Sequence, residues 1–153
     1  MSDTTAGFWA FSLHVWQNEA LRCQLLALQE RDDLDINLCL FLLWISTLGL
    51  VLDDSESKIT HVQGQWLDQT IKPIRVLRMA NQHRPQLKQA LLTAELESEK
   101  CYQEALCQIR DTITRQTEAA DNDKAATLKT NLKSYSQISW DSALINLMLE
   151  ASQ

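Results

Sequence analysis

The sequence predicts an all-α protein, a single-domain bundle of about six helices over residues 1–153 with an apolar central helix. Three observations support this fold class. Only 3 glycines and 2 prolines occur among 153 residues, apolar residues recur at helical spacing, and one stretch of 17 residues carries no charge. Average usage would give roughly 18 glycines and prolines together, and these residues form most of the turns of many-stranded sheets. Sandwiches and barrels of short strands are therefore excluded, as are glycine-rich phosphate-binding loops, because every glycine is isolated.

Turn and cap residues divide the chain into elements. Asp33 or Asp35 can cap the third helix, because a carboxylate accepts hydrogen bonds from the free amides of a first turn. Gly49 is expected to end that helix in a left-handed conformation, and Ser139 is expected to cap the last one. The expected helices cover residues 8–19, 20–31, 36–48, a segment from about residue 55 that contains Trp66, residues 85–116, 125–135 and 139–151.

The charge-free stretch, Ile36 to Leu52, is the expected central helix. A membrane-spanning helix needs about 20 apolar residues, and basic residues usually flank it. This stretch is shorter and is flanked by Asp35 and Asp53. A helix that is apolar all round is also typical of the buried centre of a bundle, so we expect burial within the protein and no membrane association.

Two features of the second half concern helix continuity. Pro73 lies inside a periodic apolar pattern, so that it either kinks one helix or begins a new one. Further on, an apolar stripe predicts an amphipathic helix from about Pro85 to Gln116, roughly 45 Å long. The residues of the stripe are Leu87, Leu91, Ala94, Ser98, Cys101, Ala105, Ile109 and Ile113.

The sequence shows no constellation of residues typical of catalysis or metal binding. Its 4 cysteines and 3 histidines have no metal-ligand spacing. Glu95 and Glu99 are one helical turn apart, but the Glu-x-x-His motif that completes a metal site in helical bundles is absent. We therefore expect a non-enzymatic protein without metal or cofactor.

Two groups of polar residues stand out. Asn37 shares a stripe with Phe41 and Trp44, so it should point inward and need hydrogen-bond partners. The segment from Lys72 to Lys88 contains five basic residues and no acidic one, and its Arg75 and Arg78 project on the same side as Ile71.

If the Ile71 side faces the core, both arginines must be paired. Asp35, Glu95 and Glu99 are the available carboxylates. Two interpretations are open. An arginine–carboxylate network could tie the middle helices together, or the arginine pair could bind a phosphate or carboxylate ligand.

The chain resembles an uncharacterised family of small, all-helical Gram-negative bacterial proteins that is known only as a domain of unknown function. The matching segments are Phe8-Trp9-x-Phe11-Ser12-Leu13 with Trp16, Leu26-x-Leu28-Gln29, Asp35-Ile36-Asn37-Leu38 with Phe41 and Trp44, Trp66 with Pro73-Ile74-Arg75 and Arg78, and Asn131-Leu132 with Tyr135. The resemblance implies a cytoplasmic helical protein and brings no activity. It also places a glycine in the turn before Asp35, where this chain has Asp32-Asp33.

Several of these residues could share one buried network or line one pocket: Trp16, Asp35, Asn37, Trp44, Trp66, Arg75 and Arg78. Two functions are compatible with them. The leading hypothesis is a protein-interaction or adaptor protein, acting with a protein partner or as a homo-oligomer. The alternative is a small-molecule binder or enzyme with a tryptophan-lined pocket, in which the arginine pair holds an anionic group.

Nucleic acid is an unfavourable partner, because the chain carries a net charge of -6. The basic segment from Lys72 to Lys88 offers only a local exception.

Overall fold

The computed structural model describes residues 3–117 and 123–153. It is all-α, as predicted, apart from one short two-stranded ribbon. The elements in chain order are α1 (Asp3–Trp16), α2 (Glu19–Asp32), α3 (Ile36–Thr47), β1 (Leu50–Leu52), α4 (Lys58–Gln63), the π-helix η1 (Gly64–Ile71), α5 (Lys72–Ala80), α6 (Pro85–Ile113), β2 (Thr114–Gln116), α7 (Lys124–Tyr135) and α8 (Ser142–Ala151). Because α4, η1 and α5 follow one another without a break, the described residues form seven helical rods, which correspond in order to the seven expected segments.

The centre of the fold is α3, which confirms the apolar central helix. Every residue from Leu38 to Ser46 is buried, since α1, α2, α6 and α7 all pack around this helix. Asp35 caps it, and its Oδ1 accepts a hydrogen bond from the Leu38 amide at 3.1 Å. Gly49 follows the helix with a φ of 72°, the left-handed conformation expected there.

The turn before α3 is left-handed although it lacks glycine. Asp33 has a φ of 55° and ends α2 in the αL conformation. Aspartate tolerates this region better than most residues, so this turn forms without a glycine.

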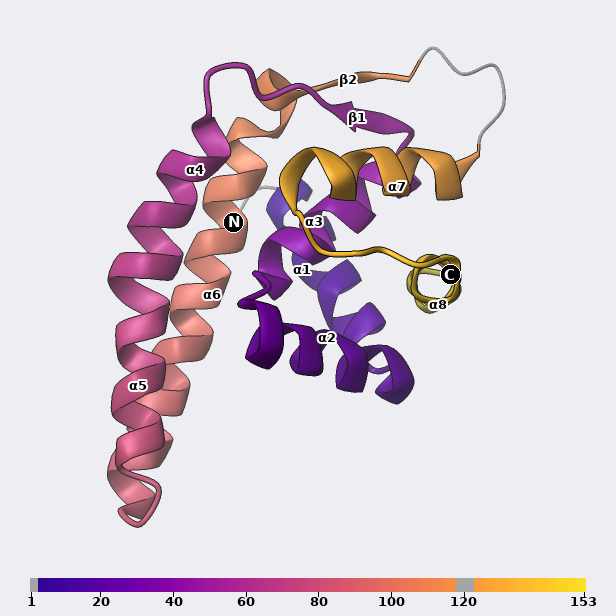
Figure 1. Ribbon diagram of the computed structural model, residues 1–153. Helices are drawn as coiled ribbons and strands as arrows, with labels where there is room; N and C mark the ends of the chain where they lie inside the picture. Colours follow the sequence, from indigo (N-terminus) through magenta and orange to yellow (C-terminus); the bar gives the residue numbers. More distant parts are fainter. Residues whose placement is uncertain (1–2, 118–122) are drawn as a thin grey trace.

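Pro73 lies inside one continuous rod, so it does not divide two helices. The π-helix comes directly before it, and the Lys72 amide donates to the carbonyl of Leu67, five residues back. Proline cannot donate the usual bond to the residue four positions back, and the wider π-helical spacing is found where the regular helical ladder is interrupted. Figure 1 shows this rod lying against α6 as a long hairpin whose tip extends beyond the rest of the molecule.

The long helix α6 ends at Ile113, three residues before the expected end, because Thr114–Gln116 pair antiparallel with Leu50–Leu52 as β2. Its most buried face also differs from the predicted stripe. Ser98 and Ile113 are buried, whereas Leu87 is exposed, and three polar residues outside the stripe are buried as well: Glu95, Tyr102 and Gln103. Since α6 is contacted by α5 and η1 on one side and by α1 and α3 on another, a single stripe could not describe its buried surface.

The last helix is capped by Asp141 rather than by Ser139. The Asp141 carboxylate accepts a hydrogen bond from the Leu144 amide at 2.7 Å. This correction moves the helix start to Ser142.

None of the described helices combines the length and the apolar character that crossing a membrane requires.

Candidate binding groove

An open groove of about 990 Å³ lies between the body of the protein and the hairpin. One wall comes from α1, α2 and the start of α3, and the other comes from Leu67 of η1 and from α5 and α6. In Figure 1 these walls are the indigo helices of the body and the magenta-to-salmon hairpin. The hairpin therefore forms one side of the groove along part of its length.

Exposed apolar side chains line both walls. Leu13 and Leu26 lie on the body side, and Val76, Met79 and Leu96 lie on the hairpin side. Their exposed fractions range from 44% to 67%. They account for five of the nine large apolar side chains that are exposed in the described part of the chain, so more than half of this surface converges on one groove.

An arginine–glutamate cluster occupies the hairpin wall. Arg75 Nε donates to Glu95 Oε1 at 2.8 Å, and Arg78 Nε donates to Glu95 Oε2 at 2.5 Å. Burial works to raise the pKa of Glu95, but the hydrogen bonds and positive charges of Arg78 and Arg75 outweigh it and hold the pKa below its ordinary value. Of the two interpretations, the observed contacts therefore match the first, in which the arginines form a network with carboxylates.

Glu99, one turn further along α6, is less well paired. Its Oε1 lies 3.6 Å from Arg75 Nη2, beyond ordinary hydrogen-bond distance. Burial and repulsion from Glu95 raise the pKa of Glu99 to about 7, although Arg75 opposes the shift. The groove thus contains a carboxyl group that exchanges its proton near neutral pH.

Asp35 does not join the arginines, contrary to one expectation. Its Oδ2 accepts hydrogen bonds from Tyr102 Oη at 2.5 Å and from Gln63 Nε2 at 2.9 Å, and Gln63 also donates to Tyr135 Oη. Burial raises the pKa of Asp35 despite these bonds. This network fastens the start of α3 to α4, α6 and α7 beneath the groove.

Asn37 is half-buried and finds its partner on α6. Gln103 Nε2 donates to Asn37 Oδ1 at 2.9 Å and to Ser12 Oγ at 3.1 Å. These three side chains all line the groove. They give it a neutral polar patch whose hydrogen bonds connect α1, α3 and α6.

The predicted site residues separate into two sets. Five of the seven line the groove: Trp16, Asp35, Asn37, Arg75 and Arg78. Trp44 instead stacks on Phe8 with ring centroids 5.1 Å apart, with the Arg110 guanidinium over its ring. Trp66 packs partly buried against the core. No single pocket or network joins all seven, because Trp44 lies on the side of α3 that meets α1 and the end of α6.

Sequence reasoning missed the apolar lining of the groove. Val76 and Met79 are three residues apart on the helix that carries the arginines, a spacing that places them on one side and could have been noticed. Leu13 and Leu26 lie on two different helices. Their convergence depends on how α1 and α2 pack, and no local pattern indicates it.

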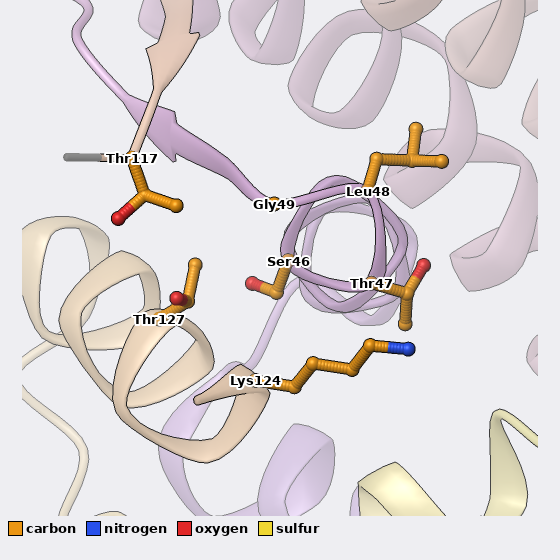
Figure 2. A pocket seen from close by; sticks show the side chains of 7 residues that line it. All are labelled: Ser46, Thr47, Leu48, Gly49, Thr117, Lys124 and Thr127. Atoms are coloured by element: carbon orange, nitrogen blue, oxygen red, sulfur yellow. The ribbon is translucent and has the colours of Figure 1, made fainter. Parts of the chain in front are cut away.

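A second, smaller hollow of about 220 Å³ lies at the end of α3. Figure 2 shows Ser46 pointing toward the side of the hollow where Thr117 and Thr127 lie, with the Lys124 side chain reaching across toward Thr47. Its hydroxyl groups are already used within the fold. Ser46 donates to the Leu42 carbonyl, Thr47 donates to Trp44, and Thr127 donates to Asp123.

Among the described residues, no three histidine, cysteine, aspartate or glutamate side chains are grouped closely enough to hold a metal ion. Within the same residues, the indole N–H of Trp140 is the one buried side-chain polar atom without a hydrogen-bond partner, and Trp140 lines neither hollow.

The chain belongs to the family described as "Protein of unknown function (DUF2390)", whose model matches residues 7–106. This confirms the resemblance to a family known as a domain of unknown function. No curated protein and no solved structure shows significant similarity to the chain. All residues that line the groove fall between residues 9 and 103, inside the matched region, whereas three of the seven residues around the smaller hollow lie beyond it.

Proposed function

We propose that this member of the DUF2390 family is a non-enzymatic protein-interaction module whose groove holds an amphipathic α-helix of a partner protein. The observation that carries the proposal is the convergence of five exposed apolar side chains on one open groove. A contiguous exposed apolar surface with polar edges is typical of an interaction site. Recognition of one helix by a groove between others is a recurrent binding mode.

The size of the groove supports a helical occupant. An α-helix with its side chains is about 10–12 Å across, so about two helical turns occupy a volume similar to the groove's 990 Å³. The groove is open to solvent, so its occupant can be part of a larger protein. The apolar face of such a helix would cover Leu26 on one wall and Val76 and Met79 on the other.

The alternative, a small-molecule binder that uses the arginine pair to hold an anion, has less support. The groove volume is at the upper end of the usual range for small-molecule sites, about 300–1,000 Å³. However, Arg75 and Arg78 already donate to Glu95, and an anion would have to compete with that carboxylate. Trp9 and Trp16 line the groove, but Trp44, which the alternative also places in the pocket, does not.

Nucleic acid has less support still. Lys72 of the basic segment bonds to Asp33 at 2.8 Å, and Arg75 and Arg78 are paired with Glu95. Phosphate backbones are recognised by cationic groups that are free to replace counterions.

We place the protein in the bacterial cytoplasm, following the family resemblance.

The test uses two neighbouring variants, Val76→Asp and Leu77→Asp. Both side chains are exposed on α5, at 67% and 53%, but only Val76 lines the groove. Each full-length protein would capture partners from a lysate of the native organism. A peptide spanning the captured protein's helix would then be titrated into the labelled module while its nuclear magnetic resonance spectrum is followed.

We expect a stoichiometric partner that the wild type and Leu77→Asp capture and Val76→Asp does not, with peptide-induced shifts confined to groove residues. Equal capture by Val76→Asp, or shifts located elsewhere, would contradict the proposal. Light scattering adds a further check, because a homodimer that only Val76→Asp dissociates would mean that a second copy occupies the groove. A small molecule retained in native mass spectrometry would favour the alternative function.

A further inference from the structure

We propose, on the basis of the proposed function, that the helix bound in the groove carries a lysine or arginine within its apolar face, and that Glu99 recognises this residue. The partner would then be an amphipathic helix with one basic group on its buried side, and Glu99 would set its specificity.

The positions of the two carboxylates on α6 give Glu99 this role. Glu95 accepts hydrogen bonds on both oxygens, from Arg75 and from Arg78. Glu99 has only the 3.6 Å contact with Arg75 Nη2, and no other described residue makes an ion pair with it. Of the two, Glu99 is therefore the carboxylate with acceptor capacity left for a ligand.

The charges around the groove favour the same partner. Its lining contains five acidic residues and three basic ones, a formal excess of two negative charges: Glu30, Asp33, Asp35, Glu95 and Glu99 against Lys72, Arg75 and Arg78. Each basic residue already has a carboxylate partner within the protein. A basic residue on the incoming helix is thus complementary to the groove, whereas an acidic residue in the same place would be repelled.

Glu99 also departs from what stability alone would favour. Burial first, then the charges of Glu95 and Asp35, raise the pKa of Glu99 to about 7, while Arg75 and Arg78 oppose the shift. A carboxyl in this position makes the fold less stable when it ionises. Departures of this kind are expected where a residue serves binding, and a cation placed beside Glu99 would favour loss of its proton.

The experiment uses three synthetic peptides of about 18 residues, or five helical turns. Each is built from leucine, alanine and glutamine so that leucines occupy one face. They differ only at one central position of that face, which is lysine, glutamine or glutamate. Their affinities for the full-length protein would be measured by isothermal titration calorimetry at pH 6 and pH 8.

At pH 8 we expect the lysine peptide to bind about tenfold more tightly than the glutamine peptide, with the glutamate peptide weakest. Affinity for the lysine peptide should fall about tenfold at pH 6, because the ionised fraction of a group with a pKa of about 7 drops from about nine-tenths to about one-tenth. The charged groups facing Glu99 are Glu95, Arg75, Arg78 and Asp35, and they are present for all three peptides.

Glu99→Gln should remove both the lysine preference and its pH dependence while the protein stays folded by circular dichroism. Glu97→Gln is the matched control, since Glu97 is on the same helix, is 64% exposed and pairs only with Lys100 in the described structure. It removes the same charge from the protein but should leave the peptide preference intact.

The possible failures point to different conclusions. Equal binding of the lysine and glutamate peptides, or a lysine preference that survives Glu99→Gln, would overturn the role of Glu99 and leave the helix-binding groove in place. Failure of all three peptides to bind would contradict the groove's proposed function itself.

Discussion

Two polar clusters of this protein are built in opposite ways. The first cluster lies where α7 meets the end of α3, and its central residue, Asn131 of α7, is fully buried. Its Nδ2 donates to Ser46 Oγ at 2.8 Å and to the Leu50 carbonyl at 3.0 Å, and its Oδ1 accepts from the Leu52 amide at 2.8 Å. This cluster is neutral and closed, and every polar atom of the Asn131 side chain is used. The groove cluster of Arg75, Arg78, Glu95 and Glu99 is charged and open.

The difference separates a structural polar cluster from one suited to binding. The amide of Asn131 holds β1, α3 and α7 together, and its complete burial closes it to other molecules. In the groove, Glu99 keeps acceptor capacity, and exposed apolar side chains surround it. The incomplete cluster is therefore the place to look for a ligand, and substitutions in the two clusters should have different consequences.

The largest loss of stability is expected from Asn131→Ala. The substitution leaves the Leu52 amide and the Leu50 carbonyl without their side-chain partner, so that the free energy of unfolding should fall by about 3 kcal/mol. Urea denaturation measures this loss. The control is Thr130→Ala, a change at the exposed neighbouring residue, whose free energy of unfolding should stay within about 0.5 kcal/mol of the wild type. A change below about 1 kcal/mol would mean that the closed cluster does not hold these elements together.

A smaller loss is expected from Glu95→Ala. The substitution removes the acceptor of two guanidiniums. Because the side chains of Arg75 and Arg78 are 25% and 19% exposed, water and Glu99 can replace part of the lost hydrogen bonding. The free energy of unfolding should therefore fall by about 2 kcal/mol.

The loss of stability caused by Glu95→Ala should be smaller at low pH than at neutral pH. The folded-state pKa of Glu95 is below its ordinary 4.5, so its contribution is present above that value and should vanish as acid protonates it. Denaturation at pH 7 and pH 3 checks both effects, with Glu97→Ala as the exposed-side control. An effect that is equal at both pH values would contradict the ion-pair origin.

Glu99→Gln should stabilise the protein, opposite to the first two changes. Because the folded-state pKa of Glu99 is about 7, above the ordinary 4.5, the stability contributed by its bound proton is present below pH 4.5 and lost as pH rises through 7. Glutamine stays neutral, so the gain should be near zero at pH 5 and about 1–2 kcal/mol at pH 8. Thermal unfolding at the two pH values measures it, and a loss of stability at pH 8 would show that Arg75 holds Glu99 more firmly than its geometry indicates.

The smallest effect on stability is expected at the groove's apolar edge. Val76→Asp and Leu77→Asp change side chains that are already exposed, so each should alter the free energy of unfolding by less than about 0.5 kcal/mol. Only Val76→Asp should abolish helix binding. If it also unfolds the protein, Val76 belongs to the core and the comparison between a structural cluster and an open groove fails.

Parts of the site were predictable because they depend on local rules. The helical spacing of Arg75 and Arg78 and the need to pair half-buried guanidiniums predict a carboxylate partner, and Glu95 and Glu99 were named as candidates. The apolar run likewise predicts a carboxylate cap before α3, with Asp33 and Asp35 as alternatives, and Asp35 is the one that caps it. The sequence does not predict how the three carboxylates are paired. Glu95 accepts hydrogen bonds from both arginines, and Asp35 accepts one from Tyr102. Glu99 has only the 3.6 Å contact with Arg75.

The sequence by itself determined the fold class and the central helix with its end at Gly49, and it narrowed the N-terminal cap of that helix to Asp33 or Asp35. Scarce turn residues, apolar runs and capping carboxylates act within a few residues along the chain. Only the tertiary structure decided that Pro73 stays within one rod and that Trp44 and Trp66 face away from the groove. It also decided that Leu13 and Leu26 converge with Val76, Met79 and Leu96. These outcomes depend on how whole helices pack, and that packing is decided by contacts between residues far apart in sequence. The scarcity of glycine and proline predicted long helices, and the packing of those helices formed the groove.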